Sequence, residues 1–236
     1  MRSVTVPLVG NAQTMPRKSK LGSGVLLQRG QDFLLLTVQH LFRSDAQWSF
    51  ETGITHNRES LNISIRDLRA LKKRDLKSGA MQEIDLAWGW LRRTDMVEGL
   101  QSLPDPKPKM ILPVYDGPLD TAVMEDEQYG YAANNRIKWN PQSRELMREP
   151  SFEVGMTLRS RHESDGTVEF ELARDHQGNE YYNGASGAPI ADRSGRIVAL
   201  LVGSAPGNVI IGVELSQFSA LFDLDPPQSP PSASAA

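Results

Sequence analysis

Short apolar runs, each ended by turn-forming residues, are the feature that most limits how this chain can fold. Val4 to Val9, Gly24 to Leu27 and Phe33 to Leu36 are such runs, and Gln28-Arg29-Gly30-Gln31-Asp32 favours a hairpin between the last two. Leu61 to Ile65 alternates apolar and polar residues with the period of a half-buried strand. Many such runs with regular turn signals predict an all-β fold of the barrel class.

The same pattern continues through the second half of the chain. The further runs are Met110 to Val114, Gln128 to Ala133, Met156 to Arg161, Val168 to Ala173, Ile197 to Val202 and Val209 to Val213. Ser216 is a suitable N-cap for a short closing helix over Gln217 to Leu221. The charged segment Arg66 to Lys77 fits either a short surface helix or a loop.

Three segments carry residue types that together suit acyl-transfer chemistry. Ser186 is surrounded by small residues, which allow a tight loop with outward N–H groups that can hold an oxyanion. His40 directly follows an apolar run, whereas the other three histidines lie in polar surroundings. Asp85 lies between Ile84 and Leu86, so its carboxylate needs a partner if it is buried. The chain order His, Asp, Ser is one of the known orders of the catalytic triad.

These segments resemble the catalytic blocks of the chymotrypsin-like (trypsin-like) serine proteases. Thr37-Val38-Gln39-His40 is similar to the family's Thr/Ser-Ala-Ala-His block, and Asp85-Leu86-Ala87 to its Asp-Ile-Ala block. Gly184-Ala185-Ser186-Gly187-Ala188-Pro189 is similar to its Gly-Asp-Ser-Gly-Gly-Pro block. The resemblance spans residues 20 to 222, but only the three blocks are specific.

The resemblance implies a fold and an activity. The fold is two six-stranded antiparallel barrels with a short C-terminal helix, the first barrel supplying His40 and Asp85 and the second Ser186. The activity is that of a serine endopeptidase, which hydrolyses peptide bonds through an acyl-enzyme. In that chemistry Ser186 is the nucleophile, His40 moves the proton, and Asp85 orients His40. The backbone N–H groups of Gly184 and Ser186 form the oxyanion hole.

The resemblance also places the substrate pocket near the serine. Glu180 and Tyr181 precede the motif, and Val202, Gly203 and Ser204 lie on the strand that follows it. Glu180 either faces a basic substrate side chain or lies on the surface, and the sequence leaves both open.

Ala185 departs from the family pattern. Many family members have aspartate there, and in zymogen-derived proteases this aspartate pairs with an N-terminus freed by cleavage. Alanine cannot make that pair. We therefore expect an oxyanion hole that forms without N-terminal cleavage, as in bacterial heat-shock-type and viral members.

Composition narrows the setting of the protein. The 236 residues, 39% of them apolar, suit one compact unit of two small barrels. The absence of cysteine favours a reducing compartment or a bacterial or viral source. With neither a signal peptide nor a long apolar segment, the chain is expected to be cytoplasmic, without membrane contact.

The expected partners are few. The net charge of −3 gives no case for binding nucleic acid. No cofactor or metal is expected, because the chain has no cysteine and no His-Glu-x-x-His motif. The predicted partner is a protein or peptide substrate. A regulatory partner, or a fused neighbour beyond the C-terminal tail, is also compatible with the sequence.

The resemblance and the composition together suggest how the chain is divided. Residues 1–103 are expected to form the first barrel, 104–109 a proline-rich linker, 110–225 the second barrel with its helix, and 226–236 a disordered Pro/Ser/Ala tail.

Two other readings compete with a serine protease. An α/β-hydrolase is disfavoured, because Ala188 replaces the second glycine of Gly-x-Ser-x-Gly and no histidine follows His176. The other reading is a latent or catalytically silent protease-like domain that acts as a binding or scaffold module. Retention of all three candidate triad residues favours the enzyme.

Overall fold

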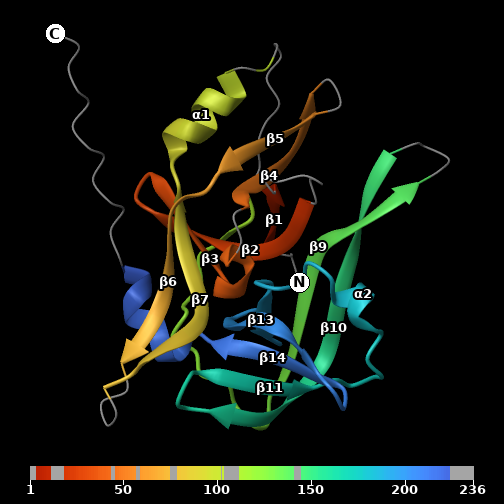
Figure 1. Ribbon diagram of the computed structural model, residues 1–236. Coiled ribbons are helices and arrows are strands. Elements are labelled where there is room, and N and C mark those ends of the chain that lie inside the picture. The colour runs from red at the N-terminus through yellow and green to blue at the C-terminus, as the bar shows by residue number, and fades with distance from the viewer. Residues whose placement is uncertain are drawn as a thin grey trace.

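The structure, a computed structural model, describes residues 4–11, 19–43, 46–56, 59–74, 79–101, 103, 112–140 and 145–223. This part of the chain is mostly β-structure with a few short helices, which confirms the predicted fold class (Figure 1). The predicted linker at 104–109 and the predicted tail at 226–236 lie outside the described residues.

The N-terminal sheet has eight strands and curls into a half-barrel (Figure 1). Its order is β5-β4-β1-β2-β3-β7-β6, with β8 paired to β2. The strands are β1 Thr5–Asn11, β2 Ser19–Arg29, β3 Asp32–Thr37, β4 Gln47–His56, β5 Glu59–Ser64, β6 Arg66–Arg74, β7 Met81–Leu91 and β8 Val114–Tyr115. A closed six-stranded barrel was expected here, but within the described ranges the outer strands β5 and β6 do not pair with each other.

The C-terminal half forms a closed six-stranded barrel in the order β10-β11-β14-β13-β12-β9, as expected. Its strands are β9 Gln128–Asn140, β10 Glu145–His162, β11 Thr167–Glu171, β12 Pro189–Asp192, β13 Ile197–Ala205 and β14 Val209–Glu214. Every neighbouring pair is antiparallel. The far ends of β9 and β10 extend past the barrel as a two-stranded arm (Figure 1).

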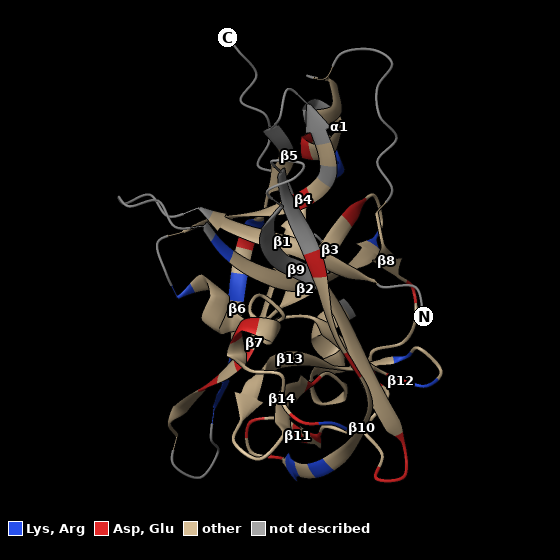
Figure 2. Cartoon of the chain, turned by 90° about the vertical axis from the view of Figure 1, so that its right-hand side faces the viewer, with Lys and Arg blue, Asp and Glu red and all other residues tan. Residues whose placement is uncertain are grey.

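The segment that was expected to be a helix or a loop is strand β6, so that expectation was wrong. β6 pairs with β7 with register shifts between Arg66 and Arg69 and between Ala70 and Lys72. These irregularities break the alternation by which a strand is recognised. β6 is also an edge strand, which tolerates the charges seen along it in Figure 2, because its outer side faces solvent.

Four short helices are present among the described residues. They are η1 Gln39–Phe42, α1 Arg93–Gln101, α2 Asn179–Tyr182 and η2 Ser216–Asp223. The predicted closing helix is present as η2, a 3₁₀-helix that is longer than expected. Sequence reasoning did not anticipate α1 or α2.

The hydrophobic core joins the two halves of the molecule. One buried cluster contains the inner face of the N-terminal sheet together with Ile197, Leu200, Val213 and Phe222 from the C-terminal half. A second cluster fills the closed barrel around Phe170. Because the first cluster draws on both halves, the N-terminal sheet does not bury its apolar surface alone.

Two segments contact both halves of the molecule and hold the two sheets together. β8 returns to the N-terminal sheet, and its Tyr115 hydroxyl accepts a hydrogen bond from the Ile197 N–H (3.2 Å). η2 packs on the same sheet, where Arg29 Nε donates to the Phe222 carbonyl (2.7 Å). These contacts help to hold the N-terminal sheet against the C-terminal half.

Candidate active site

The sheet places His40 beside Asp85. β3 and β7 are antiparallel with Thr37 opposite Ala87, so the turn after β3 reaches back to the middle of β7. The His40 N–H donates to Asp85 Oδ1 (2.8 Å), and His40 Nδ1 lies 2.8 Å from Asp85 Oδ2. One carboxylate therefore holds both the main chain and the ring of the histidine, as the orienting residue of a triad does.

The ionised form of Asp85 is favoured in the folded state. Burial acts to raise the pKa of Asp85, but it is outweighed by hydrogen bonds from His40 and by the charges of His40 and Arg43. The net result is a pKa below the ordinary 3.8. The carboxylate is thus ready to accept the Nδ1–H of a neutral imidazole at neutral pH.

The loop that carries Ser186 is fastened to the N-terminal sheet. The Ser23 N–H donates to the Ser186 carbonyl (2.8 Å), and Ser23 Oγ donates to the Gly184 carbonyl (3.0 Å). Thr37 Oγ1 in turn donates to the Ser23 carbonyl (2.7 Å), inside the strand that leads to His40. The serine loop therefore lies against the same strands that position the histidine.

Gly187 is required for that close approach. Its φ of +87° is rarely adopted by residues with a side chain, and a Cβ there would lie 2.0 Å from the Ser23 carbonyl oxygen and 2.5 Å from Thr37 Oγ1. The glycine after the serine thus lets the two sheets meet at the site.

The Ser186 hydroxyl is not bonded to the histidine in this structure. It donates to the Val202 carbonyl (3.3 Å), and among the described residues no hydrogen bond joins Ser186 to His40. Hydrogen bonds between catalytic groups are often long or misaligned without substrate and tighten in the complex.

Two N–H groups beside Ser186 are free to bind an anion. Within the described chain, the N–H groups of Gly184 and Ser186 have no hydrogen-bond acceptor, whereas the Ala185 N–H donates to the Tyr182 carbonyl (2.9 Å). Gly184 has a φ of +79°, which glycine adopts without strain. A pair of unused N–H groups around a serine is what an oxyanion hole requires.

The residues predicted to line the substrate pocket are dispersed. Glu180 is exposed, and the Tyr181 hydroxyl bonds to the main chain of Phe152 in β10. Val202 contacts Ser186 directly, and Gly203 and Ser204 follow it toward the surface. Of the five, Val202 is the one bonded to Ser186. The contribution of Ser23 had no signal in the sequence, because this residue belongs to no motif.

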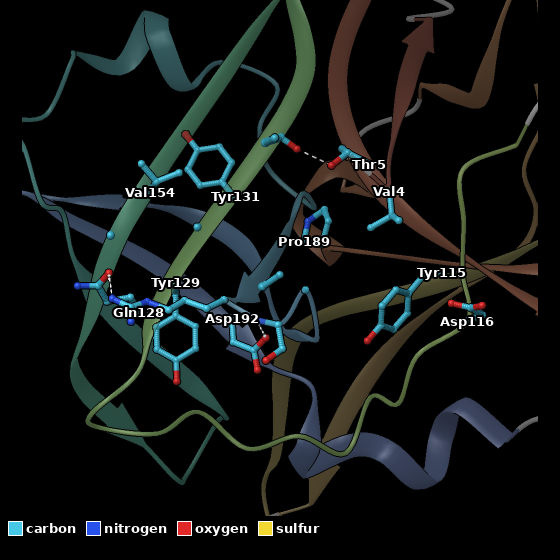
Figure 3. A pocket seen from close by; sticks show the side chains of 17 residues that line it. Val4, Thr5, Tyr115, Asp116, Gln128, Tyr129, Tyr131, Val154, Pro189 and Asp192 are labelled. Atoms are coloured by element: carbon cyan, nitrogen blue, oxygen red, sulfur yellow. Dashed lines mark hydrogen bonds between the residues drawn. The ribbon is translucent and has the colours of Figure 1, made fainter. Parts of the chain in front are cut away.

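Two cavities are lined by described residues. The larger, of about 660 Å³, has Tyr115, Tyr129, Pro189 and Asp192 on its walls (Figure 3) and contains none of His40, Asp85 and Ser186. The smaller, of about 400 Å³, adjoins η1 and is lined by Gln39, Arg43, Trp48 and Ala87, among others. Size alone would favour the larger cavity as part of the active site. The smaller cavity, however, borders the elements that hold His40 and Asp85.

Two further features of the described residues bear on chemistry and location. They contain no group of three or more His, Asp or Glu side chains arranged to hold a metal ion. None of their helices is long and apolar enough to cross a bilayer.

Comparison with known proteins adds information at the level of structure. No protein-family model matches the sequence, and no curated protein matches it. The structure is similar to neuropsin, a serine protease expressed in the limbic system of mouse brain, with 11% identity and a TM-score of 0.56 over 94% of this chain and 93% of that one. It is similar to human heparin binding protein, with 14% identity and a TM-score of 0.54 over 94% of each chain.

A third similar structure is a scabies mite inactivated protease paralogue, with 10% identity and a TM-score of 0.53 over 92% of this chain and 91% of that one. The chain has the chymotrypsin-like serine protease fold. This confirms the fold implied by the three sequence blocks. The matched structures include a protease and an inactivated paralogue, so the chymotrypsin-like fold is compatible with either state.

Proposed function

We propose that this protein is a serine endopeptidase that uses His40, Asp85 and Ser186. The observation that carries the proposal is the paired contact of Asp85 with the ring and main chain of His40, both at 2.8 Å. It occurs beside a serine loop fastened to the strand that leads to His40.

The chemistry follows from this geometry. The Ser186 hydroxyl turns from the Val202 carbonyl toward His40 Nε2, gives up its proton, and attacks the scissile carbonyl carbon. The resulting oxyanion accepts hydrogen bonds from the N–H groups of Gly184 and Ser186. His40 passes the proton to the leaving amine, and the C–N bond breaks to leave an acyl-enzyme. Water, deprotonated by His40, then releases the acid and restores the serine.

We further propose that the site forms without N-terminal cleavage. Ala185 is fully buried and carries only a methyl group, so it cannot pair with a new N-terminal amine. Glu180, Tyr181, Val202, Gly203 and Ser204 remain the candidate substrate-binding residues, with a protein or peptide as substrate.

A catalytically silent module is the second candidate function. The observation in its favour is the Ser186 hydroxyl, which bonds to Val202 rather than to His40. The same fold also occurs in an inactivated protease paralogue. In this alternative the protein would bind peptides or a partner without cleaving them.

Labelling with a fluorophosphonate probe separates the two candidates. The intact chain should be labelled at Ser186, as mapped by peptide mass spectrometry, and Ser186→Ala and His40→Ala should abolish the adduct. Asp85→Asn should slow labelling by about 10⁴-fold while the fold is retained. Ser194→Ala, an exposed serine on the following turn, is the matched control and should label like wild type. No labelling of a folded wild-type sample would favour the silent module.

A further inference from the structure

Glu153 is a buried carboxylate with no part in the mechanism above. It lies in β10, and its side chain is 1% exposed. Arg174 binds both of its oxygens, with Nε 2.8 Å from Oε2 and Nη2 3.2 Å from Oε1. The Tyr182 hydroxyl donates to Oε1 (2.9 Å). A carboxylate this deeply buried needs such partners, and here they come from the segment that leads to Ser186.

Tyr182 connects this carboxylate to the oxyanion loop. It is the last residue of α2, its ring is buried, and its carbonyl accepts the Ala185 N–H (2.9 Å). That bond orients the peptide that lies between the two free N–H groups of Gly184 and Ser186. Moving the Tyr182 ring would therefore move the oxyanion donors.

Arg174 contacts Glu153 and its neighbours from the solvent side. Its guanidinium lies 5.7 Å from the centre of the Phe152 ring and 5.8 Å from that of Tyr181, and it also donates to the Phe152 carbonyl (3.0 Å). The pKa of Tyr182 is raised to about 12, mainly by burial and further by the hydrogen bond to Glu153 and the charge of Glu153. The tyrosine therefore remains a protonated donor to Glu153 across the neutral range.

The segment before Ser186 needs an external anchor. α2 has only four residues, and so short a helix is not stable by itself. Ala185 offers only a methyl group for the purpose. Glu153 provides such an anchor, because its main chain lies opposite Tyr131 of β9 in the closed barrel.

We propose that Glu153 and Tyr182 are positioning residues that hold the oxyanion-hole segment in its active conformation. Arg174 supports this arrangement by neutralising the charge of the Glu153 carboxylate. The inference rests on the proposed function, because positioning matters only if an oxyanion forms at the site.

The test compares Tyr182→Phe, Glu153→Gln and the double variant with wild type, using the rate of fluorophosphonate labelling as a function of pH. The phosphonyl oxygen of the probe occupies the oxyanion hole, so we expect the plateau rate to fall by about 10- to 100-fold. The midpoint of the pH profile should not move, because neither substitution alters a hydrogen bond of His40 or Asp85. The double variant should be no slower than the slower single variant, since both changes break the same bond.

Glu214→Gln is the matched control. Glu214 is another buried carboxylate of the same barrel with an arginine partner, Arg161 (3.1 Å), but among the described residues its side chain makes no hydrogen bond or ion pair with the serine loop. It should lower stability in the same way as Glu153→Gln and leave the labelling rate unchanged. A plateau lowered equally by Glu214→Gln would mean that general destabilisation explains the effect, and would overturn the proposal.

Hydrogen exchange in peptides covering 178–188 gives a readout that does not depend on activity. Both single variants should exchange faster there than wild type, and Glu214→Gln should not. If wild type is labelled and the Glu153 and Tyr182 variants are labelled as fast as wild type, the positioning role of Glu153 and Tyr182 is overturned while the proposed function stands. If wild type is not labelled, the proposed function fails, and the exchange data alone then support or overturn the anchoring.

Discussion

Asp85 shows how a single side chain depends on its neighbours. Its lowered pKa means that the ionised carboxylate is more stable in the folded chain than in the unfolded chain. The resulting stability is fully present above the ordinary pKa of 3.8 and is lost as the pH falls through the lower, folded-state pKa. We therefore expect the free-energy difference between wild type and Asp85→Asn to shrink as the pH falls below about 4.

Denaturant unfolding of both proteins between pH 3 and pH 7 measures this difference. Other carboxylates titrate equally in the two proteins, so their effects cancel in the comparison. A difference that stays constant down to pH 3 would show that the His40 contacts do not favour the ionised form of Asp85.

Gly187 gives a prediction at the same scale. Gly187→Ala places a methyl group 2.0 Å from the Ser23 carbonyl oxygen at a φ of +87°, so the serine loop must move away from the N-terminal sheet. We expect a loss of about 2–4 kcal/mol in unfolding free energy, together with slower fluorophosphonate labelling. Gly195→Ala is the control. Gly195 has a φ of +84°, but a Cβ added there would have no atom within 4 Å, so this variant measures the cost of the backbone strain alone. Equal losses in both variants would contradict the packing argument.

At the scale of elements, η2 is the clearest case of a segment whose role depends on a distant partner. It follows the last strand of the closed barrel, yet its Phe222 is 3% exposed within the cluster of the N-terminal sheet. The end of the described chain therefore helps to cover the first sheet, which is not closed by strand pairing.

Phe222→Ala should destabilise the whole protein by about 3–5 kcal/mol, because it leaves a cavity in a core shared by both halves. Urea unfolding measures this loss. Val154→Ala is a suitable control, since Val154 is 69% exposed and its truncation should cost little. A loss below about 1 kcal/mol for Phe222→Ala would mean that η2 is not an integral part of the first sheet's core.

At the scale of the whole molecule, the two halves are expected to unfold together. They share a hydrophobic cluster, and they exchange hydrogen bonds through Ser23 and Gly184, Arg29 and Phe222, and Tyr115 and Ile197. Scanning calorimetry should show one transition with a calorimetric enthalpy equal to the van't Hoff enthalpy. Two resolved transitions would indicate that each half has a core sufficient for its own stability.

The fold was predictable because its signals are local. Alternation, apolar runs and turn residues identified most strands of both sheets, and the serine loop and closing helix were placed correctly. β6 was missed, since two register shifts disturb its alternation, and α2 was missed because four residues carry too little periodicity. The open form of the first sheet depends on pairings between strands far apart in the chain, which no local window contains.

The sequence by itself determined the all-β class and nominated His40, Asp85 and Ser186 as candidates, because these follow from residue type, order and short-range pattern. Only the tertiary structure decided how they meet. Ser23 and Gly184 are 161 residues apart, yet their hydrogen bond helps to bring the serine loop to the strand before His40. Glu153, Arg174 and Tyr182 likewise converge only when β10 packs behind that loop. Such contacts depend on which distant strands become neighbours, and that is settled by the packing of the whole chain.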